Sequence, residues 1–251
     1  MKLNFVGTVV AIALGAACPV ILAQDEGKDQ KDDSPGAIDT ESAEAKALAK
    51  KLHVTANWRP KKSTIDLTYT WKDEPELTDW KWKGADKCEY AKAGPQEENP
   101  IAGLEVGVSS SGSAVGLLDG VEFNGDFTIE WTLKALYNAG SSDLVFLVGV
   151  HKNEGIGVRF GDQLVRLKSG GISAITKNEP SRDKFALMKI NTVKIVRTGD
   201  EIQTWLNKVE QPKKKLSKKE LDGKIGLLCA SNMRIKIQKL TVSGSIAKPT
   251  P

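Results

Sequence analysis

One short segment of the sequence carries side chains that are suited to binding a sugar. Gln203, Trp205 and Asn207 alternate along a predicted strand, so their side chains project from one face of it. An outward indole ring can stack on the apolar face of a sugar while flanking amides hydrogen-bond its hydroxyl groups. The alternative is that the second layer of the fold or a loop covers Trp205. Arg159 and Arg166 are further candidates for the same groove, although sequence alone does not align their strands with Trp205.

Candidate groups for catalysis are fewer. Glu130 lies on a predicted strand, where Thr128 and Thr132 are its neighbours on the same face. A retaining glycosidase needs two carboxyl groups about 5 Å apart, one as acid and one as nucleophile, and this strand supplies only one. His151 follows a predicted strand, and its pairing with Glu130 or Asp162 is the combination to test first for hydrolysis, although a loop histidine is more often incidental. The catalytic residues are therefore unknown, with Glu130 and His151 as candidates.

The N-terminal part of the sequence is predicted to precede the folded domain. Residues 1–23 combine an early charge, Lys2, with an apolar run and a small residue before a polar stretch, which is the pattern of a secretory signal peptide. A membrane anchor of marginal length and lipid attachment at Cys18 are the alternatives. Residues 24–36 are polar and charged, which predicts a disordered linker. Residues 37–53 place apolar residues at helical spacing, with acids early and lysines late, so we expect a short helix.

The rest of the sequence has the periodicity of β-strands. Phe127–Lys134 is the clearest example, because its odd-numbered residues are apolar and its even-numbered residues are polar. Asp143–Val150 is almost continuously apolar, which is typical of a central strand covered on both faces. A change of parity in the last strand predicts a β-bulge near Gln238–Lys239. Many strands without a long helix between them predict an all-β domain, an antiparallel β-sandwich, over residues 63–247.

Two cysteines, Cys88 and Cys229, remain after removal of the predicted signal peptide. An exported protein meets an oxidising compartment, so a disulfide between them is one expectation. Two buried thiols are the alternative, and the sequence does not decide between the two. The spacing of the cysteines and of the two histidines, His53 and His151, indicates no metal site, so the sequence predicts no cofactor.

The charge distribution bears on partners and location. The net charge of +4 is small, and the segment Pro212–Lys219 holds five lysines. This segment could hold an anionic polysaccharide or an envelope surface by charge, or it is a solvated loop that aids solubility. Lysines without interleaved aromatic residues do not predict nucleic-acid binding. We expect a periplasmic or extracellular protein with no membrane span after signal cleavage, and a glycan or cell-envelope polysaccharide as its partner.

The strand and turn motifs occur in a recognisable order. They are Phe123–Trp131, Asn191–Arg197, the turn Gly199-Asp200, Trp205–Asn207, Gly223–Leu227 and Leu240–Gly244. This series resembles the concanavalin A-like lectin/glucanase superfamily. Within it, the sequence looks most like the bacterial exported 3-keto-disaccharide hydrolase-like domains, whose function is largely unknown. The resemblance implies a jelly-roll sandwich and says little about activity.

Several departures limit what the resemblance implies about chemistry. Laminarinase-type members carry a Glu-x-Asp-x-x-Glu strand, and no such run occurs in this sequence. In the hydrolase-like branch, Gln usually follows the closing Gly-x-Ile-Gly-Leu, whereas this sequence has Leu228 and Cys229. No catalytic residue is therefore carried over. Members of the superfamily often hold a structural Ca²⁺, for which Asp119, Glu122 and Asp126 are candidate ligands by proximity alone.

Three functions are compatible with these features. The first, which we prefer, is an exported, non-catalytic carbohydrate-binding or surface-interaction module. The second is a glycoside-acting hydrolase of the 3-keto-disaccharide hydrolase-like group, and the third is a structural envelope protein without a small ligand. Two carboxylates, or a histidine and a carboxylate, converging beside Trp205 would favour an enzyme. A groove of aromatic and amide groups would favour binding, and loops that fill the groove would favour the third function.

Overall fold

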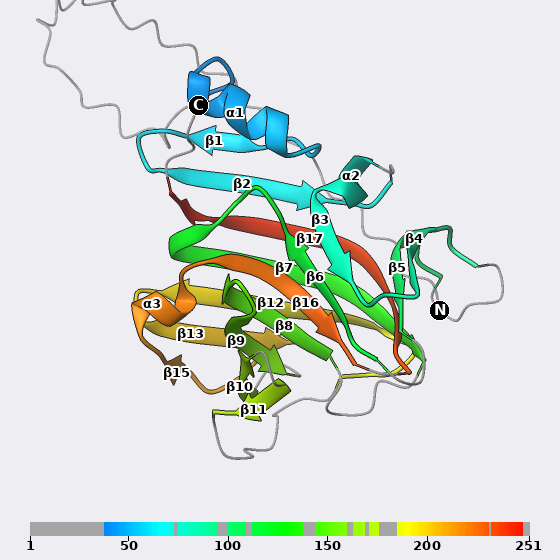
Figure 1. Cartoon of the computed structure of the whole chain (residues 1–251). Helices are drawn as coiled ribbons and strands as arrows, with labels where there is room; N and C mark the ends of the chain where they lie inside the picture. Colours follow the sequence, from blue (N-terminus) through cyan, green and yellow to red (C-terminus); the bar gives the residue numbers. More distant parts are fainter. Residues whose placement is uncertain are drawn as a thin grey trace, which may run out of the picture. The chain divides into compact units, whose positions relative to one another are not determined.

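The computed structural model describes residues 38–72, 75–94, 100–108, 112–137, 144–159, 163–168, 171–175, 185–230 and 232–247. The predicted signal peptide, the predicted linker and the candidate Asp162 lie outside these residues. The described chain forms two antiparallel sheets that enclose a shared core (Figure 1). The antiparallel β-sandwich predicted from the sequence is therefore confirmed.

The larger sheet has ten strands within the described residues. Its main path is β1 (Asn57–Arg59), β2 (Thr64–Tyr69), β17 (Arg234–Ile246), β7 (Phe123–Tyr137), β12 (Ile190–Thr198), β13 (Glu201–Leu206) and β14 (Val209–Glu210). The remaining strands are β15 (Lys214–Lys215) beside β13, and β5 (Gly103–Gly107) between β17 and β4 (Lys87–Ala91). The long strands β7 and β17 form the middle of this sheet.

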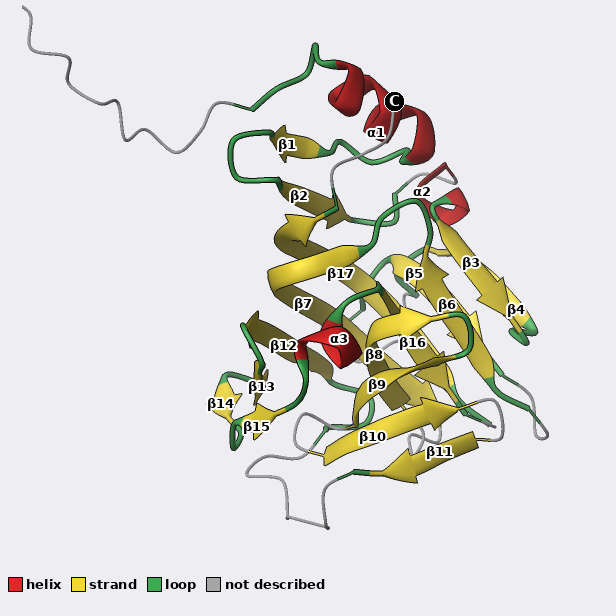
Figure 2. Cartoon of the chain, turned by 60° about the vertical axis from the view of Figure 1, so that its left-hand side comes forward, coloured by secondary structure: helices red, strands yellow, loops and turns green. Residues whose placement is uncertain are grey.

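The smaller sheet has seven strands in the described part of the chain. Their order is β11 (Gly171–Ala174), β10 (Gln163–Lys168), β9 (Glu154–Arg159), β8 (Leu144–His151), β16 (Lys224–Cys229), β6 (Ala114–Leu118) and β3 (Trp80–Lys83). Two short helices, α2 (Pro75–Thr78) and α3 (Lys218–Leu221), precede β3 and β16. Figure 2 shows β9, β10 and β11 curving away from the rest of the sandwich.

The core lies between the two sheets and contains a chain of aromatic rings. The ring of Trp131 on β7 is 5.6 Å from that of Trp80 on β3 and 6.0 Å from that of Phe146 on β8. Tyr69 and Trp71, at the end of β2, continue the contact with a stacked pair 5.1 Å apart. Tyr69 and Trp71 also contact Trp80, so these rings connect strands of both sheets across the core.

The helix that we expected over residues 37–53 is α1, Ala43–Lys51. It begins later because Ser42, whose Oγ accepts a hydrogen bond from the backbone N–H of Ala45 at 3.1 Å, is its N-cap. Asp39, which precedes the helix, pairs with β1 and donates its backbone N–H to the carbonyl of Trp58 at 2.9 Å. Leu48 is buried in the sandwich core, so the apolar stripe of α1 docks on the domain.

Details of two strands agree with their sequence patterns, and one differs. The register of β17 shifts between Ile237 and Lys239, where a bulge was expected. Residues 144–150 of β8 are all buried, as expected for a central strand. On β7 the inward and outward alternation holds as far as Leu133, but Lys134, expected to face outward, is fully buried. In the described residues, no helix is both long and apolar enough to cross a bilayer.

Candidate functional site

The register of three neighbouring strands brings Trp205 and Glu130 onto one surface. Lys194 on β12 is the cross-strand partner of Trp205 on β13 and also of Glu130 on β7. Val193 and Ile195, the neighbours of Lys194 along β12, are buried in the core. Because side chains alternate along a strand, Lys194 and its two partners project from the outer face of the larger sheet. Three residues far apart in sequence therefore form one row across the sheet.

These side chains surround a hollow of about 320 Å³ on the outer face, which we call the Trp205 hollow. Its lining residues are Glu130, Thr192, Lys194, Trp205 and Lys208. Trp205 is partly exposed, and the ammonium of Lys194 lies 5.3 Å from the centroid of its ring. The hollow therefore combines an open aromatic surface, a hydroxyl group and charged groups of both signs.

The two amides expected beside Trp205 serve the fold instead. Gln203 is only 7% exposed, and its amide N–H donates to the carbonyl of Gln211. Asn207 lies beyond the end of β13, in a turn where its φ of +50° is one that asparagine tolerates. Its Oδ1 accepts the backbone N–H of Thr192 at 3.0 Å. Strand parity predicted outward side chains at both positions, but the first is covered and the second is a turn residue.

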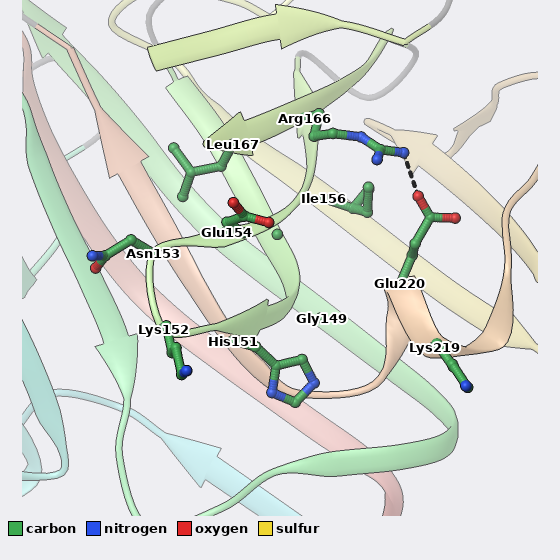
Figure 3. A pocket seen from close by; sticks show the side chains of 11 residues that line it. Gly149, His151, Lys152, Asn153, Glu154, Ile156, Arg166, Leu167, Lys219 and Glu220 are labelled. Carbon is green, nitrogen blue, oxygen red and sulfur yellow. Dashed lines mark hydrogen bonds and ion pairs between the residues drawn. The ribbon is translucent and has the colours of Figure 1, made fainter. Parts of the chain in front are cut away.

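The candidates Arg159, Arg166 and His151 lie on the smaller sheet and do not line the Trp205 hollow. Arg166 and His151 instead line a second hollow of about 460 Å³ together with Glu154 and Glu220 (Figure 3). His151 is the cross-strand partner of Glu154 at the β8–β9 turn. The pair of His151 with Glu130, proposed for hydrolysis, is therefore not formed, because the two residues belong to different sheets.

Glu220, one of the two acids that line this second hollow, is held by structural contacts. Gly149 has a φ of +61°, and a Cβ placed there would lie 2.1 Å from the carbonyl oxygen of Glu220, so glycine permits the close approach of α3 to β8. The carboxylate of Glu220 accepts the hydroxyl of Ser217 at 2.7 Å and pairs with Arg166. Hydrogen bonds from Ser217, with a smaller effect of Arg166, lower the pKa of Glu220. Glu220 is thus poorly suited to act as a general acid.

The outer face of the smaller sheet is apolar. Leu228 pairs across the strands with Val145 and Val115, and together with Leu147 and Val165 these residues belong to a second hydrophobic cluster. Four of these five side chains are at most 4% exposed, so aliphatic groups fill this part of the face.

The three acids considered for Ca²⁺ do not gather into one cluster in the described structure. Asp119 is held by the ammonium groups of Lys224 and Lys81, and their hydrogen bonds lower its pKa to about 2. Asp126 accepts the backbone N–H of Gly199 at 2.7 Å. Among the residues that the structure describes, no three His, Cys, Asp or Glu side chains gather closely enough to hold a metal ion.

The two cysteines are free thiols in this structure. Cys88, on β4, is half-buried, and Cys229, at the end of β16, is fully buried. Burial raises the pKa of Cys88 to about 11 and raises that of Cys229 as well. Both thiols are therefore protonated and slow to react at neutral pH. A disulfide between them in an oxidising compartment stays a prediction.

The lysine-rich segment is partly neutralised by neighbouring acids. Lys215 pairs with Asp200 at 3.3 Å, and Lys213 lies 3.8 Å from Glu201. Both acids come from the turn and the start of β13, to which β15 is hydrogen-bonded. This arrangement favours the interpretation of a solvated loop over that of a free cationic patch.

One buried polar network could not be expected from the sequence. Asp79 is 1% exposed, and its carboxylate accepts hydrogen bonds from the backbone N–H of His53 at 2.8 Å and from the hydroxyl of Tyr69 at 3.0 Å. The Nδ1 atom of His53 also lies 2.8 Å from Asp79. These contacts fix the segment after α1 to the sandwich. Because 26 residues separate His53 from Asp79, no local pattern signals the pair.

No family model and no curated protein matches the sequence. Solved structures similar in fold include the carbohydrate-binding module CBM66 from Bacillus subtilis (15% identity; 64% of this chain and 94% of that chain covered; TM-score 0.47). The lectin UEA-II complexed with galactose shows 8% identity over 71% of this chain and 98% of its own, with a TM-score of 0.48. A Bacillus subtilis protein of unknown function with a galectin-like fold shows 10% identity over 72% of this chain and 96% of its own, with a TM-score of 0.45. The assignment of the β-sandwich rests on the two sheets themselves.

Proposed function

We propose that this chain is an exported carbohydrate-binding module that holds a sugar ring against Trp205, on the outer face of the larger sheet. The observation that carries the proposal is the partly exposed Trp205 ring at the edge of a hollow lined by Glu130, Thr192 and Lys194. Sugar sites combine an aromatic surface with a few hydrogen-bonding groups that fix orientation. Export is part of the proposal and rests on the sequence pattern of residues 1–23.

Trp205 is the one tryptophan of the chain that neither belongs to the hydrophobic core nor packs against it. Trp58, Trp71, Trp80 and Trp131 are buried, and Trp82 packs half-buried against the core. An indole left at the surface does not contribute the stabilisation that its burial would give, about 25 cal/mol per Å² of apolar surface. A use outside folding accounts for that cost, and stacking on a sugar is a use that fits the polar groups around this ring.

The groups at the Trp205 hollow favour binding over hydrolysis. Glu130 is the one carboxylate among its described lining residues, whereas glycoside hydrolysis uses two. The candidate His151 lies on the other sheet. We therefore propose a non-catalytic module, with the 3-keto-disaccharide type of hydrolase and the ligand-free envelope protein as the alternatives that experiment must separate.

A glycan array probed with the full chain and matched variants tests the proposal. We expect the wild type to bind at least one glycan, and Trp205→Ala to lose about tenfold or more of the affinity, or roughly 1.4 kcal/mol. Trp205→Phe should keep part of the affinity because it retains a ring. The control is Ile190→Ala, which removes an exposed apolar side chain from β12 outside the hollow and should bind normally. Binding to no glycan, or binding unchanged in Trp205→Ala, would contradict the proposal.

The same glycans separate the alternatives. The wild type and Glu130→Gln are incubated with every glycan that binds, and the products are separated by chromatography. We expect both proteins to leave the glycan intact. Cleavage by the wild type that disappears in Glu130→Gln would show a hydrolase and overturn the non-catalytic part of the proposal. A chain that binds no glycan would leave the structural envelope role as the better interpretation.

A further inference from the structure

A third hollow lies beside Thr132, whose side chain projects from the same outer face of the larger sheet as Glu130. It has a volume of about 720 Å³, and we call it the Tyr90 hollow. Its lining residues are Thr70, Lys72, Tyr90, Ala102, Thr132, Gln238 and Lys239. Tyr90, on β4, is half-buried, so its ring offers a second aromatic surface beside hydroxyl and amide groups.

The two hollows meet at a pair of threonines. Thr132 on β7 lines the Tyr90 hollow, and its cross-strand partner, Thr192 on β12, lines the Trp205 hollow. Directly opposed residues of antiparallel strands have Cβ atoms about 4.5–5.5 Å apart. Lys239 on β17 is the next partner of Thr132. The two hollows therefore adjoin across the β7–β12 pair, and we call them together the joined groove.

This joined groove is basic. Lys72 and Lys239 line the Tyr90 hollow without an acidic partner in its lining, and Lys194 and Lys208 line the Trp205 hollow with Glu130. Four lysines against one carboxylate give the lining a net charge of +3. In the described part of the chain, no ion pair joins any of these lysines to a carboxylate.

Three lysines elsewhere on the surface are paired with acids. Lys81 and Lys224 share Asp119, and Lys215 pairs with Asp200. The groove lysines have no such partner among the described residues, so the lining carries a net positive charge. Such a field attracts and orients a ligand of opposite charge.

We propose that the joined groove binds a linear anionic polysaccharide, with one sugar ring stacked on Trp205 and carboxylate or sulfate groups near Lys72 and Lys239. This inference rests on the proposed function and adds to it the charge and the shape of the ligand. A groove that crosses several strands, each about 4.8 Å from the next, fits a chain of several sugar units better than a single sugar. The charged contacts are open to solvent, so their effect weakens as salt rises.

Titration calorimetry of the full chain with charge-matched pairs of glycans tests this proposal. A hexasaccharide of galacturonate is compared with its methyl ester, and dextran sulfate with dextran. The double variant Lys72→Gln with Lys239→Gln should bind the anionic member roughly three- to tenfold more weakly and the neutral member unchanged, since each exposed charge pair contributes modestly. The control double variant, Lys83→Gln with Lys168→Gln, removes two exposed lysines of the smaller sheet and should bind as the wild type does.

The outcomes separate the two proposals. Tighter binding of the anionic member, lost with the groove lysines but kept with the control lysines, supports the inference, and the pair that shows it identifies the carboxylate or the sulfate as the group recognised. Equal affinity for anionic and neutral glycans, or equal losses in both double variants, overturns the inference. If Trp205→Ala still abolishes binding in that case, the proposed function stands. If no glycan binds, both proposals fail.

Discussion

The ammonium of Lys194 lies 5.3 Å from the centre of the Trp205 ring, across a pair of residues directly opposed in the β12–β13 register. An ammonium over an indole ring at an exposed site contributes about 0.5–1 kcal/mol. The contact limits the orientations of a surface tryptophan before any ligand arrives. A ring held in place loses less conformational entropy on binding, and this strengthens the affinity for a ligand.

The Lys194–Trp205 contact should be measurable in the free protein. Lys194→Gln is expected to lower the free energy of unfolding by about 0.5–1 kcal/mol. Urea denaturation of this variant, of Trp205→Ala and of the double variant gives a double-mutant cycle that isolates the pair. Lys208→Gln serves as the control, because Lys208 lines the same hollow but makes no cation–π contact in the described structure. A coupling energy of zero would show that the ring is not held by Lys194.

Two glycines with the same backbone angle provide a matched test of how α3 is placed. Gly149 and Gly199 have φ values of +61° and +62°, but only at Gly149 would a Cβ meet the chain, 2.1 Å from the carbonyl oxygen of Glu220. Gly199→Ala should cost about 1–2 kcal/mol for the left-handed conformation alone. Gly149→Ala should cost clearly more in urea denaturation and should speed hydrogen exchange in α3. Equal costs for the two substitutions would contradict this account of the β8–α3 contact.

The stability of the protein should depend on pH through Asp119. Hydrogen bonds from Lys224 and Lys81 lower its pKa from 3.8 to about 2 in the folded state. A carboxyl group whose pKa is depressed by folding contributes stability above its unfolded pKa and loses it as the pH falls through the folded value. The melting temperature of the wild type should therefore exceed that of Asp119→Asn at neutral pH, and the difference should shrink below pH 3.8 and vanish below about pH 2.

The size of this effect and its control follow from the same contacts. The side chain of Asp119 is 30% exposed, so solvent screening keeps its contribution within the roughly 0–1 kcal/mol of surface ion pairs. In an Asp119→Asn background, Lys224→Gln should cause no further pH-dependent change. A melting-temperature difference that stays constant down to the lowest pH would show that the ion pairs do not stabilise the fold.

Strand patterns predicted which face of a sheet a side chain occupies, and they did so reliably where that face is in contact with the core. The alternation along residues 127–133 and the bulge before Lys239 are examples. Lys134 and Gln203 have outward parity and are nevertheless buried. Parity identifies the face of the sheet on which a side chain lies. Burial also depends on whether other segments cover that face, and those segments come from distant parts of the sequence.

The candidate site was predicted in parts but not as a whole. Trp205 and Glu130 were each singled out by residue type, yet only the register through Lys194 shows that they are neighbours. Lys194 and Thr192 are the polar residues of an alternating strand. That pattern identifies an outer face, but it does not show which residues of the neighbouring strands lie beside them. Tyr90 had no signal, because its place beside Thr132 depends on the pairing of β4 with β5 and of β5 with β17.

A structure of the protein bound to an oligosaccharide would show whether a sugar chain lies on the outer face of the larger sheet. We expect one sugar ring stacked on Trp205 and a chain that crosses the sheet over Thr192 and Thr132. An oligosaccharide bound on the apolar outer face of the smaller sheet, or in the hollow beside His151, with the Trp205 hollow empty, would contradict it.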